Sequence, residues 1–88
     1  MPIISMFYGI MIKMYFMDKG QHNSPHFNAV YGEYEAVYSL AGDVIAGELP
    51  IRQNAFVKAW ALLHEEELAA NWTLAIAGED VYKIKPLR

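Results

Sequence analysis

Hydrophobic and polar positions in the first half of the chain follow patterns that predict β-strands. Ile3–Phe7 and Ile10–Met17 are apolar segments separated by Tyr8-Gly9, and we expect them to pair as an N-terminal hairpin. Ile10–Met17 is largely apolar on both of its faces. A strand of this kind is typically central in a sheet or covered on both sides.

The segment that starts at residue 26 predicts a second hairpin with a defined register. Gly32-Glu33 has the Gly-X pattern of a two-residue type II′ turn. Side chains alternate between the two faces of a strand, so a slip of one residue would mix apolar and polar residues on each face. In the expected register the apolar face pairs Tyr31 with Tyr34, Ala29 with Ala36 and Phe27 with Tyr38. The other face pairs Val30 with Glu35, Asn28 with Val37 and His26 with Ser39.

A third strand should extend this hairpin into a meander. Gly42-Asp43 repeats the turn pattern and places Leu40 opposite Ile45. The expected strands of the meander are Phe27–Tyr31, Glu33–Leu40 and Val44–Ala46.

The chain between Ile51 and Ala77 contains neither proline nor glycine, and its composition favours helix. Pro50 suits the first turn of a helix, and Gly78 suits the stop at its end. The apolar residues fall on two nearly opposite sides, which a single straight amphipathic helix does not show. We therefore expect a bend or a break near His64–Glu67. The first side holds Phe56, Ala59, Trp60 and Leu63, and the second holds Leu68, Trp72, Ala75 and Ile76.

Strands that precede helices in this way indicate an α+β fold rather than alternating βαβ units. The expected sheet is antiparallel and consists of the N-terminal hairpin, the three-stranded meander and a short C-terminal strand, Val81–Lys85, with Tyr82 and Ile84 pointing inward. One bent helix or two consecutive helices should pack on one face of this sheet. With 88 residues the chain has room for a single domain, residues 1–88, and for one small core.

Composition narrows the classes of function. The chain has no cysteine, which excludes disulfides, thiolate catalysis and cysteine-bound zinc. Its hydrophobic fraction of 55% excludes intrinsic disorder. The net charge is −3 and a net basic segment occurs only in the last eight residues, so we expect no strong binding to nucleic acid. The sequence contains no glycine-rich phosphate loop or dinucleotide motif, and we expect no cofactor.

The apolar N-terminus is a candidate targeting segment. It lacks the basic start and the cleavage site of a signal peptide, and its apolar run is shorter than a membrane span. We therefore interpret it as strands and expect a cytoplasmic protein with no membrane contact.

The richest polar segment runs from Asp18 to Asn28 and holds two of the three histidines. Histidine suits proton transfer near neutral pH and is a frequent metal ligand. One interpretation is a metal site in which Asp18, His22 and His26 supply three ligands beside a water. A second is general acid–base catalysis by His26 with Glu35, and with His22 as a further candidate, as in metal-independent RNA cleavage.

A third interpretation is a binding surface, because the expected register brings several polar side chains to one face. We expect the imidazole of His26 to point away from the aromatic face and toward the carboxylate of Glu35. The alternative to all three is a plain turn at Asn23-Ser24-Pro25 with a histidine that satisfies nearby backbone groups. The candidate binding residues are His22, His26, Asn28, Glu35 and Ser39.

Methionine is concentrated in the first hairpin. Its side chain adapts to irregular surfaces and is frequent where proteins bind partners. Together with a charged fraction of only 19%, this suggests a partly apolar sheet face that docks another chain. Burial beneath the helices would explain the same residues equally well. The methionines concerned are Met6, Met11, Met14 and Met17.

Several stretches of the chain together resemble a known family. They are MPIISMFYGIMIKMYF at the N-terminus, HNSPHFN followed by YGEYEA, GELP before the helical region, and EELAANW within it. Over almost its whole length the chain resembles the small bacterial proteins of domain of unknown function 4160. The resemblance implies a single short bacterial domain with no assigned reaction. Such domains are often encoded next to another small protein, in pairs suggested to be toxin–antitoxin-like modules.

One position departs from the family pattern in a way that bears on catalysis. The family commonly shows His-Asn-Pro-Pro-His-Phe-His, which reads His22-Asn23-Ser24-Pro25-His26-Phe27-Asn28 here. His22 and His26 match, whereas Asn28 replaces the last histidine. Asparagine forms hydrogen bonds, but it does not shuttle protons and is a poor ligand for transition metals. This difference argues against catalysis.

The function that these observations favour is non-catalytic protein binding. The small size, the low charge, the methionine-rich hairpin and the incomplete catalytic set predict a binding component of a two-gene, toxin–antitoxin-like bacterial module. Its partner should be another small protein, or a second copy of the chain. The alternative is a small hydrolase acting on RNA, histidine-dependent or metal-assisted, in which His22 and His26 act with Glu35 or Asp18.

Overall fold

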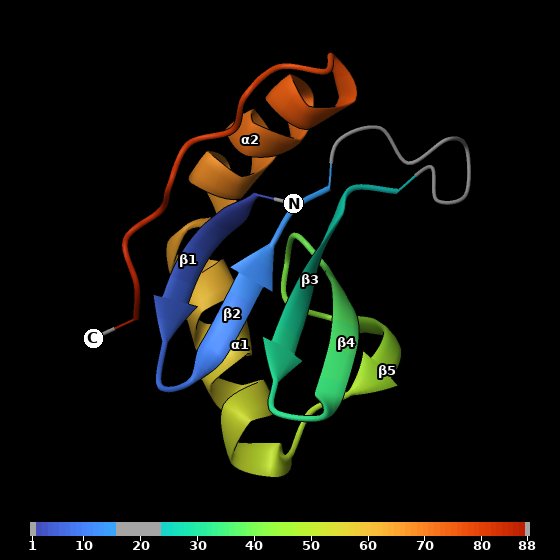
Figure 1. Ribbon diagram of the computed structural model, residues 1–88, viewed down its shortest axis with the longest axis vertical. Coiled ribbons are helices and arrows are strands. Elements are labelled where there is room, and N and C mark those ends of the chain that lie inside the picture. Colours follow the sequence, from blue (N-terminus) through green and yellow to red (C-terminus); the bar gives the residue numbers. More distant parts are fainter. Residues whose placement is uncertain (1, 16–23, 88) are drawn as a thin grey trace.

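The computed structural model describes residues 2–15 and 24–87. It contains a five-stranded antiparallel sheet followed by two helices (Figure 1), so the predicted α+β fold is confirmed. Every strand pairs with its neighbours in sequence, in the order β1-β2-β3-β4-β5. The strands are β1 (Ile3–Phe7), β2 (Ile10–Lys13), β3 (His26–Tyr31), β4 (Tyr34–Ser39) and β5 (Val44–Glu48), and the helices are α1 (Ile51–Leu63) and α2 (Glu65–Ile76).

The first hairpin forms as predicted, with its turn at Tyr8-Gly9. Both turn residues have positive φ, 49° and 78°, as in a type I′ turn, whose twist matches that of the paired strands. The second strand is shorter than expected and ends at Lys13. Phe16 and Met17, at the end of the expected strand, lie outside the described residues.

The register of the second hairpin is confirmed at every predicted pair. Tyr31 pairs with Tyr34, Phe27 with Tyr38 and His26 with Ser39, and the three remaining pairs also match. The sheet register therefore places Phe27 and Tyr38 on the helix side, where their rings stack with centroids 5.5 Å apart. This pair forms part of the hydrophobic core.

The predicted pairing of Leu40 with Ile45 is wrong. Tyr38 pairs with Val44 and Val37 pairs with Ala46, so Ile45 is an extra residue in β5 and remains 46% exposed. The shift arises because the turn is longer than the two-residue pattern predicts. The backbone amide of Gly42 donates to the carbonyl of Ser39, and the amide of Ser39 donates to the carbonyl of Asp43.

The predicted helix break is confirmed at His64, whose φ of −123° is not helical. Pro50 lies one residue before α1 as its N-cap, not within the first turn. Gly78 ends α2 as expected. The amide of Glu79 donates to the carbonyl of Leu74 and the amide of Gly78 to that of Ala75, the two bonds of a Schellman motif.

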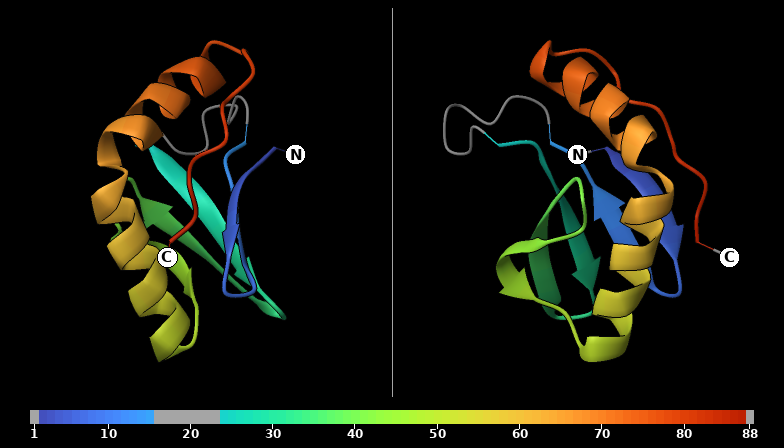
Figure 2. Two further views of the ribbon diagram at one scale, coloured as in Figure 1. Left: turned by 90° about the vertical axis from the view of Figure 1, so that its left-hand side faces the viewer. Right: turned by 180° about the vertical axis from the view of Figure 1, so that it is seen from behind.

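Both helices lie on one face of the sheet (Figure 2). Trp60 of α1 is the largest of the fully buried side chains among the described residues. Its ring contacts Phe7 at 5.4 Å and Phe27 at 5.7 Å. Not every residue on the two apolar sides of the helical region is buried, since Leu63 and Ile76 are exposed. Because the indole of Trp60 is fully buried, it fixes the rotation of α1 about its axis, and Val57 and Ala61 face the core with it. The buried residues are Val57, Trp60 and Ala61 in α1, and Leu68, Asn71 and Ala75 in α2.

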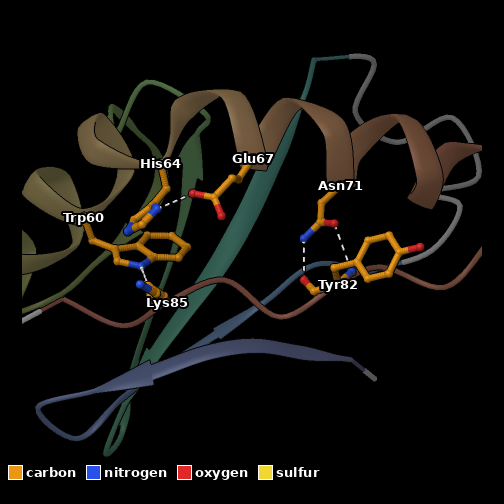
Figure 3. A network of polar contacts seen from close by, with 6 residues as sticks. All are labelled: Trp60, His64, Glu67, Asn71, Tyr82 and Lys85. Atoms are coloured by element: carbon orange, nitrogen blue, oxygen red, sulfur yellow. Dashed lines mark hydrogen bonds and ion pairs between the residues drawn. The ribbon is translucent and has the colours of Figure 1, made fainter.

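The predicted final strand, Val81–Lys85, does not form. The chain from residue 79 to 87, here called the C-terminal segment, runs beside β1 without strand pairing (Figures 1 and 2). Side chains of the helices form hydrogen bonds with backbone groups of the C-terminal segment that would otherwise be available for strand pairing. Asn71 bonds to both the amide and the carbonyl of Tyr82, and Trp60 Nε1 donates to the carbonyl of Lys85 (Figure 3). Ile84 points inward as predicted, whereas the side chain of Tyr82 is exposed.

Candidate interaction surface

The histidine-rich segment is only partly described by the structure. Asp18 and His22 lie outside the described residues. The metal site that needs both of them, and the catalytic role of His22, therefore stay predictions. Within residues 2–15 and 24–87, no three histidine, aspartate or glutamate side chains gather closely enough to hold a metal ion.

His26 is the first residue of β3, and its imidazole is buried. Its Nδ1 lies 2.9 Å from the carbonyl oxygen of Ser24. A carbonyl oxygen only accepts hydrogen bonds, so Nδ1 is the donor in this contact. The ring also contacts the indole of Trp72 in α2, with centroids 5.1 Å apart.

The expectation that the imidazole points away from the aromatic face and toward Glu35 is wrong. The ring instead contacts the indole of Trp72 in the helix layer. His26 pairs with Ser39 as predicted, but the direction of the His26 side chain does not follow from the strand register. At the first residue of a strand, the local hydrogen bond to Ser24 and the contact with Trp72 decide where the ring lies.

Asn28 and Glu35 are brought together as expected. Asn28 Nδ2 donates to Glu35 Oε2 at 3.3 Å, across the diagonal between β3 and β4. Ser39 has a different role, because its Oγ accepts the backbone amide of Asp43 in the following turn. Of the predicted binding residues that the structure describes, only Asn28 and Glu35 contact each other on the sheet surface.

The face of the sheet opposite the helices carries these two residues and an apolar strip. Strand pairing places Met11 between Met6 and Val30, and Asn28 between Lys13 and Val37. Met6 is 60% exposed, and Met11, Val30 and Val37 are half-buried. Glu35 is paired with Glu48 at one end. We call this surface the open face; it consists of Met6, Met11, Lys13, Asn28, Val30, Glu35, Val37, Ala46 and Glu48.

Lys13 and Glu48 are members of the open face that the sequence interpretation missed. Their places depend on how β2 pairs with β3 and how β5 pairs with β4. The β2–β3 connection is long, and β5 contains an extra residue, so no local pattern predicts either pairing. Glu35 and Glu48 lie opposite each other on paired strands, so this end of the open face is negatively charged.

Tyr38 lies in the core behind the open face. Its hydroxyl donates to Asn54 Oδ1 at 2.7 Å, which ties β4 to α1. Burial raises the pKa of the Tyr38 phenol to about 12. The phenol is therefore neutral at physiological pH and acts as a structural donor.

The comparison with protein families agrees with the resemblance. The model of the family described as Domain of unknown function (DUF4160) matches residues 9–73, which is most of the chain. The chain belongs to this family. In this DUF4160 protein the matched range extends from the first turn into α2 and includes most of the open face.

Other comparisons add no further relative. No curated protein and no protein of solved structure matches the chain. Among residues 2–15 and 24–87, no helix has both the length and the apolar composition that crossing a membrane requires.

Proposed function

We propose that this DUF4160 protein is a non-catalytic, protein-binding component of a two-gene, toxin–antitoxin-like bacterial module that acts in the cytoplasm. The partner is another small protein, and it docks on the open face. The observation that carries this proposal is the one-sided covering of the sheet (Figure 2), which leaves an apolar strip on the other face.

The chemistry of the open face suits a protein partner. Met6 and Met11 lie next to Val30, so apolar area is continuous across three strands. Methionine side chains adapt to the shape of a partner, and burial of their area drives association. Polar groups at the edges of an apolar patch provide register and orientation.

The charge of the open face indicates what the partner presents to it. Glu35 and Glu48 are opposite each other on neighbouring strands, and both are exposed. Like charges in this arrangement repel. A basic side chain of the partner placed between them would relieve the repulsion and add a charge-assisted contact.

The hydrolase alternative is weaker on this geometry. Acid–base catalysis by His26 with Glu35 needs both groups at one reacting atom. Glu35 instead accepts a hydrogen bond from Asn28, while the His26 ring contacts Trp72. The described residues thus supply a hydrogen-bonded surface pair and a buried histidine.

Binding to the product of the adjoining gene tests the proposal, with calorimetry on the two purified proteins. Val37→Glu, in the middle of the open face, should weaken binding at least about tenfold, since it buries a charge against an apolar partner. Val37→Thr preserves strand propensity and should give a smaller loss. Ile76→Glu is the matched control, because Ile76 is exposed on α2 and lies outside the open face. Each variant is compared with the wild type in a thermal melt.

Two results would contradict the proposal. The first is the absence of any complex with the adjoining product, or a complex equally weakened by Ile76→Glu. The second is cleavage of mixed RNA by the wild type that is lost in His26→Ala, which would favour the hydrolase. Light scattering of the protein alone distinguishes a second copy of the chain as the partner.

A further inference from the structure

A groove with a volume of about 440 Å³ lies between β1 and the C-terminal segment. Residues 3–6 form one wall and residues 83–86 form the other. Its surface is mostly apolar, and both walls are extended chain. The groove is on the edge of the sheet, away from the strands that form most of the open face.

The C-terminal segment lies beside the outer edge of β1. β1 is an edge strand of the sheet. The amide of Ile84 donates to the carbonyl of Ile4 at 2.7 Å, and no strand ladder joins the two segments in the described chain. Helix side chains hold the C-terminal segment instead (Figure 3). The C-terminal segment thus occupies the place beside β1 that a further strand would take, and the groove is the hollow that the two segments line together.

The groove also contains a polar group without a partner. Ser5 lines the groove and is 6% exposed. Its Oγ is buried and has no hydrogen-bond partner among the residues that the structure describes. A buried hydroxyl without a hydrogen-bond partner costs free energy.

The groove has a basic rim. Lys83 and Lys85 are exposed and lie two residues apart on either side of the buried Ile84. In extended chain this spacing places both side chains on the same side. Neither lysine forms an ion pair with a carboxylate of the described chain. The rim belongs to the net basic end of an otherwise acidic protein.

We infer that this groove binds an extended acidic peptide segment of a partner protein, whose apolar side chains enter the groove and whose alternate carboxylates lie at Lys83 and Lys85. Burial of the peptide's apolar side chains supplies affinity, and the two lysines select acidic sequences. The inference goes beyond the proposed function, because Met6 is the only residue of the open face that lines the groove, and binding at the groove does not depend on whether the open face binds a protein.

A pair of synthetic peptides tests this inference with the full chain. The probe is the capped peptide Thr-Val-Glu-Val-Glu-Val-Thr, whose glutamates alternate with valines, and its counterpart has lysine in place of both glutamates. Binding is followed by NMR of the isotope-labelled protein. The acidic peptide should shift the amides of residues 3–6 and 83–86, and the lysine peptide should not. Added salt should weaken binding.

Charge variants identify the role of the rim. Lys83→Gln with Lys85→Gln should weaken binding of the acidic peptide by about three- to tenfold, as expected for two exposed ion pairs. Arg52→Gln with Lys58→Gln removes the same charge from α1 and should leave the affinity unchanged. Three outcomes would overturn the inference: binding of neither peptide, equal binding of both, or shifts confined to Val30 and Val37. The last would assign the peptide to the open face and leave the proposed function standing.

Discussion

The side-chain amide of Asn71 makes two hydrogen bonds to the backbone of Tyr82. Nδ2 donates to the carbonyl at 2.7 Å, and Oδ1 accepts the amide proton at 3.0 Å (Figure 3). The amide of a single side chain thus takes the place of a peptide group in a neighbouring strand. This relationship holds the C-terminal segment against α2 and explains why no sixth strand forms.

Asn71→Ala should therefore destabilise the protein more than the removal of so few side-chain atoms suggests. Asn71 is 2% exposed, and its removal leaves two backbone groups of Tyr82 without their partners. The expected loss in free energy of unfolding is about 1–3 kcal/mol, measured by urea denaturation. Thr73→Ala, at an exposed position of the same helix, should cost less than about 0.5 kcal/mol. Equal losses in the two variants would show that the Asn71 bonds contribute nothing.

Tyr38 should make stability fall at alkaline pH. Burial raises the pKa of its phenol to about 12 in the folded protein, above the ordinary value of 10.0. The unfolded chain therefore loses this proton first, and stability that is complete below pH 10 is lost as pH rises toward 12. Urea denaturation across this range should show a smaller pH dependence in Tyr38→Phe than in the wild type. An unchanged slope would exclude Tyr38 as its source.

Gly47 should tolerate no side chain. Its φ is 73°, and a Cβ at this position would collide with the backbone carbonyl of Glu35 in the paired strand. Gly47→Ala should lower the free energy of unfolding by about 2 kcal/mol or more, since it adds a steric clash to an unfavourable backbone conformation. Gly32→Ala is the matched control. Gly32 also has positive φ, 57°, but open space around it, and should lose only about 1–2 kcal/mol.

His26 should contribute to stability whether or not it has a further role. His26→Ala removes the hydrogen bond to Ser24 and the ring contact with Trp72, for an expected loss of about 1–3 kcal/mol. His26→Phe retains the ring contact and should lose less. The two variants are compared in chemical denaturation. If His26→Ala unfolds at the same urea concentration as the wild type, the buried position of the ring is not stabilising.

The contact between Asn28 and Glu35 follows from local sequence. A short turn joins β3 and β4, and the alternation of aromatic and polar residues permits one register. The positions of other open-face residues cannot be predicted from local sequence. Lys13 reaches the open face through the pairing of β2 with β3, and Glu48 through the irregular pairing of β4 with β5.

The rotation of the helices shows a similar division. The change of apolar side along the sequence predicts the break at His64. It does not predict that Leu63 faces solvent while Ala61 is buried. That choice depends on where the indole of Trp60 fits between Phe7 and Phe27, which belong to different strands.

The sequence by itself determined the α+β order of elements, the β3–β4 register and the point at which the helix breaks, because turn residues and side-chain periodicity act over a few neighbouring positions. Only the tertiary structure decided that the His26 ring contacts Trp72, that Asn71 holds residue 82, and that a groove lies beside β1. These features join residues far apart in the chain, and their geometry depends on how the packed core places the helices against the sheet.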